Sequence, residues 1–92
     1  MKKESYDKVR RLLSNIDELI NSADITSGVL ESVKKNGGTA KIYAHTGGET
    51  YGAEINSKTM EVVFADILHA YHDSIREKKA EINKILDSTI GE

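Results

Sequence analysis

The chain has 92 residues, no cysteine, and a formal net charge of −2 at pH 7. This length fits one domain, residues 1–92, with a thin hydrophobic core. Without cysteine, a disulfide scaffold, a thiolate metal site and a cysteine nucleophile are all excluded. The charge balance argues against duplex nucleic acid as a partner, because proteins that bind it usually present a basic face. No apolar run approaches the ~18 residues of a membrane span, so we expect no membrane association and a cytoplasmic location.

The first predicted element is an amphipathic helix over Glu4–Asn21, with Ser5 as its N-cap. Its apolar residues recur at steps of three and four, which places them within about 80° of Val9 around the helix axis. They are Tyr6, Val9, Leu12, Leu13, Ile16, Leu19 and Ile20.

The segment after this helix is poor in helix formers and rich in capping residues, which favours a break near Ala23–Ser27. A short second helix would follow and end at Asn36–Gly37, where glycine suits a C-cap. One uninterrupted helix is an alternative, but it would turn Ile25 and Val29 toward solvent. A strand over Val29–Lys35 is another alternative, because Asn-Gly is also typical of hairpin turns.

Residues 39–56 alternate with period 2 and predict a β-hairpin with a two-residue turn at Gly47–Gly48. This register gives the hairpin one apolar and one polar face, and a slip of one residue would exchange them. The apolar pairs are Ala44–Tyr51, Ile42–Ala53 and Ala40–Ile55; the polar pairs are Lys41–Glu54, Tyr43–Gly52 and His45–Thr50.

The last predicted element is a long helix over residues 57–88, capped by Asn56 or Ser57, which makes the fold α+β and mostly helical. About 32 helical residues span roughly 48 Å, whereas a compact chain of this size has a radius of gyration of only ~12 Å. Either the first helix covers its apolar seam or a second chain does. We expect both, in a homodimer or a higher oligomer; a monomer with a solvated C-terminal half is the alternative.

The polar residues of the hairpin form the candidate site for a small ligand. Lysine can contact a phosphate, tyrosine rings can stack on a base, and histidine and threonine give directional hydrogen bonds. An ordinary ribbon with a polar outer face is the alternative. Arg10 and Arg11, in the locally basic N-terminal segment, are further candidates for phosphate contacts from a neighbouring subunit. The hairpin candidates are Lys41, Tyr43, His45, Thr46, Thr50 and Tyr51.

Asp66, His69 and Asp73 fall within about 60° of one another around the last helix and are the candidate metal ligands. Their face points to water, so a charged outer face with a His69–Asp73 pair is the preferred interpretation. His72 lies at the border of the apolar stripe and is expected at a boundary or an interface. No nucleophile–base pair can be assembled, so we expect no catalytic residues, no metal and no cofactor; a metal-dependent hydrolase is the weakest alternative.

In size and layout the chain resembles the small proteins with which phages counter host defence. It is similar to the oligomeric "sponges" that sequester cyclic nucleotide signals of immune systems such as CBASS or Thoeris. The resemblance implies a non-enzymatic protein of the host cytoplasm that binds a cyclic nucleotide or ADP-ribose-type signal between subunits. The competing hypothesis is a helical interaction module, an inhibitor or adaptor, whose Ile75–Leu86 seam binds a host protein. The features behind the resemblance are the length, the helix–hairpin–long helix order, and Lys41, Tyr43, His45 and Thr50.

Overall fold

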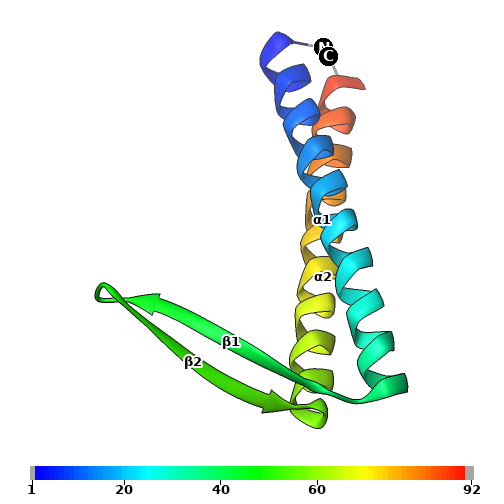
Figure 1. Ribbon diagram of the computed structural model, residues 1–92. Coiled ribbons are helices and arrows are strands. Elements are labelled where there is room, and N and C mark those ends of the chain that lie inside the picture. Colours follow the sequence, from blue (N-terminus) through cyan, green and yellow to red (C-terminus); the bar gives the residue numbers. More distant parts are fainter. Residues whose placement is uncertain (1, 91–92) are drawn as a thin grey trace.

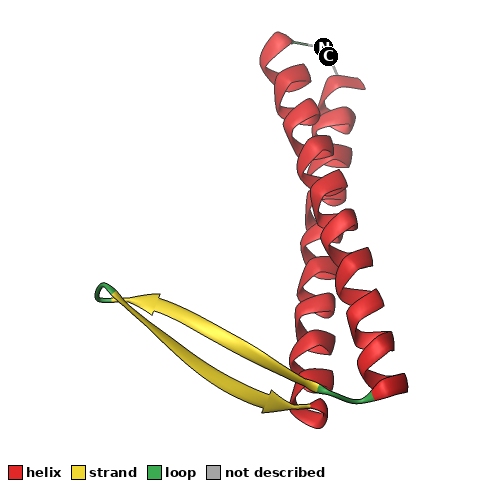
Figure 2. Ribbon diagram, viewed as in Figure 1, coloured by secondary structure: helices red, strands yellow, loops and turns green. Residues whose placement is uncertain are grey.

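The computed structural model describes residues 2–90, with the backbone alone for Ile90. It has the predicted α+β fold, in which two long helices are joined by an antiparallel β-hairpin (Figures 1 and 2). The elements in chain order are α1 (Lys3–Asn36), β1 (Thr39–Thr46), β2 (Glu49–Asn56) and α2 (Ser57–Ile90).

The two helices lie side by side and antiparallel, with both chain ends at one end of the pair and the hairpin at the other (Figure 1). Leu12 and Ile16 of α1 pack with Ile75 and Ile82 of α2, and these four form the buried core cluster. The prediction that the first helix covers the long C-terminal seam is therefore confirmed. Among the described residues the buried side chains are all apolar.

α1 is a single helix, so the break favoured by the sequence near Ala23–Ser27 is absent. Ala23 is buried, and its row continues inward through two more buried side chains, Leu30 and Val33. Ile25 is 61% exposed on the outer side, which is the cost foreseen for an uninterrupted helix. Burial of the inward row against α2 outweighs the weak helix propensity of the segment, because packing supplies most helical stability in proteins.

The two ends of α1 differ from each other in how well the sequence predicts them. Ser5 was the expected N-cap, but the helix begins at Lys3 and Lys2 occupies the cap position without a side-chain hydrogen bond. At the other end Gly37 has a φ of 69° and donates its N–H to the Val33 carbonyl at 2.8 Å, as expected for a C-cap.

All the predicted hairpin pairs are present, from Ala40 opposite Ile55 to His45 opposite Thr50. Gly47 and Gly48 have φ values of 59° and 77°, the two positive values that a type I′ turn requires. α2 then starts directly after β2. The Thr59 N–H donates to Asn56 Oδ1 at 2.9 Å, which confirms Asn56 as one of the two candidate caps.

The β-hairpin projects from the helical pair like an arm (Figure 1). The radius of gyration is 18.5 Å, well above the ~12 Å of a compact chain of this length. Within the hairpin, only Ala40 and Ile55 at its base are partly buried. The helices therefore leave most of the hairpin uncovered. Within residues 2–90 neither helix combines the length and the apolar character needed to cross a membrane.

Candidate functional site

Apart from Ala40 and Ile55 at its base, the hairpin is exposed on both faces, so the candidate ligand residues are accessible. Tyr43 is 58% exposed on the polar face and Ile42 is 49% exposed on the apolar face. A two-stranded hairpin by itself is marginally stable in water. An arm of this kind gains stability from any surface that covers its apolar face.

The polar face brings together four of the candidate residues. Lys41, Tyr43 and His45 alternate along β1, and Thr50 lies opposite His45 on β2. His45 Nδ1 and Thr50 Oγ1 form a hydrogen bond of 2.9 Å, which fixes the imidazole near the turn. Lys41 lies opposite Glu54 in the register but forms no ion pair with it in the part of the chain described. The ammonium group is thus available to an anionic ligand.

Tyr43 covers the backbone of the residue opposite it, Gly52. A Cβ at Gly52 would lie 3.1 Å from Tyr43 Cε1, closer than ordinary van der Waals contact. The glycine thus lets the ring lie against the opposite strand. One edge of the ring, at Cδ1 and Cε1, lies near Gly52, and the exposed remainder can stack on a planar group.

The structure separates Tyr51 and Thr46 from the other hairpin candidates. Tyr51 pairs with Ala44, so its side chain lies on the apolar face, opposite to Tyr43. The two rings therefore cannot stack on the same ligand within one copy, which corrects the expectation that both serve one polar face. The predicted register already contains this information, because it pairs Tyr43 with Gly52 on the polar face and Tyr51 with Ala44 on the apolar face.

Tyr51 has a specific partner on its own strand. Its hydroxyl donates to Glu49 Oε2 at 2.5 Å. This hydrogen bond to the carboxylate raises the pKa of Tyr51 above its ordinary value near 10. The neutral phenol is thus the form present at physiological pH, and it acts as a hydrogen-bond donor beside the turn.

Arg10 and Arg11 lie far from the hairpin within one copy. They belong to the part of α1 near the chain ends, whereas the hairpin extends from the opposite end of the helical pair (Figure 1). Twenty-five helical residues separate Arg11 from Asn36, which corresponds to roughly 38 Å. The Arg10 guanidinium instead lies over the Tyr6 ring, 5.9 Å from its centroid. These arginines can join a hairpin site only from another copy.

The hollows around the candidate site are shallow. An open hollow of about 290 Å³ surrounds the turn, and its size is at the lower end for a small-molecule site. It is lined by His45, Thr46, Gly47, Gly48, Glu49 and Thr50. One copy therefore offers a ligand a surface and not an enclosure.

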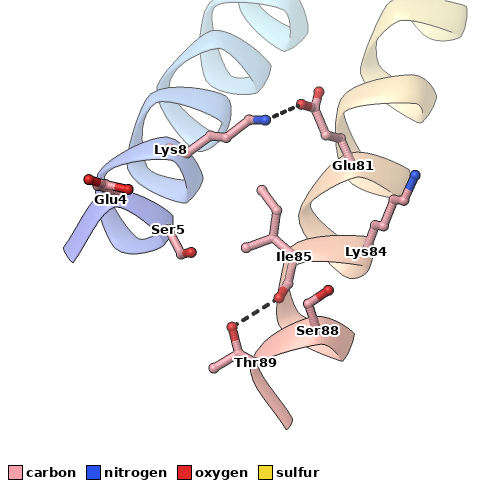
Figure 3. A pocket seen from close by; sticks show the side chains of 8 residues that line it. All are labelled: Glu4, Ser5, Lys8, Glu81, Lys84, Ile85, Ser88 and Thr89. Atoms are coloured by element: carbon pink, nitrogen blue, oxygen red, sulfur yellow. Dashed lines mark hydrogen bonds and ion pairs between the residues drawn. The ribbon is translucent and has the colours of Figure 1, made fainter. Parts of the chain in front are cut away.

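A second hollow, of about 470 Å³, lies between the first turns of α1 and the last turns of α2 (Figure 3). Lys8 Nζ and Glu81 Oε1 form an ion pair of 3.1 Å across it, and Ile85 points into the space between the helices. No local pattern in the sequence predicts this hollow, because its walls come from opposite ends of the chain. Seven of its eight lining residues are polar, and their charges are of both signs.

The candidate metal ligands form ordinary surface pairs. His69 Nε2 lies 3.5 Å from Asp73 Oδ2, so the expected pair is present, and Asp73 also pairs with Arg76. The described residues contain no group of three metal-ligating side chains. His72 is exposed on the neighbouring side of α2. This face is a solvated, charged surface of the helix.

The geometry also bears on the interaction surface proposed for the last helix. Ile75 and Ile82 are each only 9% exposed, because α1 packs on them. At Ile75 and Ile82 the Ile75–Leu86 seam is therefore covered by α1, while Leu86 at its end is 37% exposed. A partner would have to displace α1.

Comparison with family models, curated proteins and solved structures finds no match to this chain. The uncovered hairpin and the chemistry of its two faces are therefore the features that bear on function.

Proposed function

We propose that this protein is a non-enzymatic oligomer that captures a small, phosphate-containing ligand with a planar base in a pocket between subunits, lined by the polar face of the β-hairpin. The observation behind the proposal is the uncovered hairpin, whose polar face aligns Lys41, Tyr43, His45 and Thr50. Each side chain offers a different contact. The lysine ammonium attracts phosphate, the tyrosine ring stacks on a base, and the His45–Thr50 pair offers hydrogen bonds.

The need for several copies follows from the shape of one copy. Its hairpin carries the candidate residues on an open surface, and most small-molecule sites are concave. The apolar face beside Ile42 is open as well, and a second hairpin is a suitable cover for it because each supplies the same pattern of small and branched side chains. Two hairpins packed in this way point their polar faces outward, on opposite sides of the contact. Another part of a neighbouring copy would then close the pocket over each polar face, and the symmetric pair would offer two equivalent sites.

Tyr51, Thr46 and the two arginines take different roles in this assembly. Tyr51 and Thr46 lie on the face that meets the second hairpin, so they line the contact between copies. Arg10 and Arg11 reach the ligand only if another copy brings its α1 near the hairpin. The polar-face residues can thus contact the ligand within one copy. The other candidates contribute only through the assembly.

The ligand class to test first is the cyclic nucleotides and the ADP-ribose derivatives. These molecules combine phosphate with a stackable base, which matches the lysine and tyrosine of the polar face. Sequestering such a signal without cleaving it would suppress a host defence response, in line with the resemblance to phage sponges. This action requires only tight binding and no catalytic set.

A thermal-shift panel of cyclic di- and trinucleotides and ADP-ribose derivatives tests the proposal. Binding to the native state raises the melting temperature by mass action, by an amount that grows with ligand concentration. We expect stabilisation by at least one member of the panel, and we expect Lys41→Ala and Tyr43→Ala to abolish it. Lys58→Ala, which removes an exposed lysine from α2, is the matched control and should keep the full shift.

Two results would contradict the proposal. The first is a panel in which no nucleotide shifts the melting temperature at a millimolar concentration. The second is a shift that survives both hairpin substitutions, because the ligand would then bind elsewhere. Analysis of the recovered ligand by mass spectrometry would also show whether it leaves the protein unchanged, as a capturing protein requires.

A further inference from the structure

α1 carries a row of exposed apolar side chains beside its buried row. Tyr6, Leu13 and Ile20 are 53%, 51% and 40% exposed. They are spaced seven residues apart, so each successive side chain turns by only about 20° around the helix. Together they form a nearly straight apolar stripe over two heptads. α2 covers the neighbouring row with Leu12 and Ile16. It leaves this stripe uncovered within residues 2–90.

The stripe continues onto α2 on the same side of the helical pair. The Lys8–Glu81 ion pair marks the opposite side (Figure 3). Tyr6 lies about 160° from Lys8 around α1, and Leu86 lies about 140° from Glu81 around α2. Leu86 is 37% exposed, so it adds to the apolar surface near Tyr6. The helical pair thus has one side closed by an ion pair and one side that is open and apolar.

Four charged residues border the stripe with the same spacing of seven, and their sign changes half-way. The two nearest the N-terminus are basic and the two that follow are acidic: Lys3, Arg10, Asp17 and Asp24. All four are exposed, and none of them forms an ion pair with another described residue. The reversal of sign occurs near Leu13, at the centre of the stripe.

We propose that a second copy of this chain packs its stripe antiparallel on the first, with the twofold axis at Leu13. An axis there places Leu13 against Leu13 of the partner subunit and Tyr6 against Ile20 of the partner subunit. The same rotation brings Arg10 beside Asp17 of the partner subunit. A symmetric contact is self-complementary, so each of these pairs occurs twice.

The border charges select the antiparallel arrangement. In it Lys3 meets Asp24 of the partner subunit, and both acidic residues find basic partners. In a parallel arrangement Arg10 would face Arg10 and Asp17 would face Asp17, which is unfavourable at close range. The apolar pairs are centred on Leu13, and both charged pairs are centred between residues 13 and 14. One twofold axis therefore fits all of them to within about one residue.

The surface has the size of a specific interface. From Lys3 to Asp24 α1 runs for roughly 32 Å, and a contact two helices wide would cover roughly 600 Å² on each copy. The total of roughly 1,200 Å² is at the lower end of stable protein–protein interfaces. The contact leaves the two hairpins at opposite ends of the dimer, so they remain free. This dimer is therefore independent of any pairing between hairpins.

Cysteine crosslinking tests the contact directly, because the native chain has no cysteine. Leu13→Cys places a thiol at the axis, and mild oxidation of the dilute protein should convert most of it to a covalent dimer. Ile25→Cys is the matched control. It is exposed on the same helix but about 120° away around the axis, and it should give only background dimer. Equal crosslinking of the two variants would overturn the proposal.

Two further variants test the orientation. Tyr6→Cys and Ile20→Cys should each crosslink poorly alone and readily when the two proteins are mixed. Efficient crosslinking of Tyr6→Cys with itself would indicate a parallel contact and would overturn the antiparallel arrangement.

Charge reversal provides an independent readout in the Leu13→Cys background. Arg10→Glu and Asp17→Arg should each lower the yield of crosslinked dimer several-fold at limiting concentration, because each creates two like-charge contacts. Carrying both changes in one chain restores opposite charges and should return the yield to within about twofold of the parent. Single substitutions without effect, or a double variant no better than either single one, would contradict the proposed pairing.

Discussion

Tyr43 and Gly52 face each other across the hairpin so closely that a Cβ on Gly52 would lie 3.1 Å from Tyr43 Cε1 and 3.2 Å from Cδ1. This contact couples a backbone position on β2 to the orientation of an aromatic ring on β1. It explains why a glycine, which weakens a strand interior, stands in the middle of β2. The ring needs the space that a side chain would fill.

Gly52→Ala should move the Tyr43 ring without unfolding the hairpin. The added methyl group requires a shift of a few tenths of an ångström, and the ring can make it because Tyr43 is 58% exposed. We expect the ring-proton chemical shifts of Tyr43 to change in NMR spectra while the free energy of unfolding changes by less than about 1 kcal/mol. Gly28→Ala, with nothing within 4 Å of the new Cβ, is the control and should leave the Tyr43 signals in place.

Gly28→Ala should also stabilise the protein. Gly28 lies in the interior of α1, where alanine is favoured over glycine by about 0.5–1 kcal/mol. An open environment around the new Cβ removes any steric cost. The melting temperature should rise by a few degrees in a calorimetric scan. A lower melting temperature would show that α1 bends or opens at this residue.

Ile75→Ala should destabilise the fold far more than Ile25→Ala. Ile75 is 9% exposed in the core cluster, and truncation of such a residue costs about 2–5 kcal/mol. Ile25 is 61% exposed on the outer side of α1, where substitutions usually change stability by less than about 0.5 kcal/mol. Urea unfolding followed by circular dichroism measures both. Similar losses for the two variants would contradict the observed helix pairing.

Asn56→Ala should weaken the start of α2 by about 1 kcal/mol, because it removes the side-chain acceptor of the Thr59 N–H. Asn56→Asp retains an acceptor at this position and adds a negative charge near the positive end of the helix, so it should preserve stability. The comparison of the two variants by thermal unfolding separates the cap from a general effect of substitution at this site. If both variants lose stability equally, the cap contributes nothing.

Glu49→Gln should lower the pKa of Tyr51 toward its ordinary value near 10, because it removes the carboxylate that accepts the phenol proton. The raised pKa means that folding favours the neutral phenol. The associated stabilisation is fully present below the ordinary pKa and is lost as the pH rises through the folded-state pKa. NMR titration of the Tyr51 ring carbon distinguishes it from the other tyrosines. An unchanged pKa in the variant would assign the shift to another cause.

The sequence predicts the hairpin better than it predicts the long first helix. Two adjacent glycines and strict alternation fix the register, because a slip of one residue would exchange the two faces. In the segment around Ala23–Ser27 the local preferences are weak, and the burial of residues far along the chain decides the outcome. The same register places Tyr51 among the apolar pairs and Tyr43 among the polar pairs, so the two rings lie on opposite faces.

In the proposed ligand site, too, the local pattern predicts some relationships between residues and distant packing decides the others. The set Lys41, Tyr43, His45 and Thr50 can be assembled from the register alone, because hairpin partners are close in sequence. The distance from Arg10 and Arg11 to this set could not be predicted from local patterns. It depends on the direction in which α1 runs relative to the hairpin, and this direction is set by the packing of one helix on the other.

By itself the sequence determined two amphipathic helices, one hairpin and its register, because backbone hydrogen bonding and side-chain periodicity act between near neighbours. Tertiary structure alone decided that α1 continues through Ala23–Ser27 and that the hairpin extends away from both helices. These outcomes depend on apolar burial between residues far apart in the sequence, such as Ile16 and Ile75, which are 59 positions apart. Burial of that kind depends on where the chain returns in space, and no local pattern encodes it.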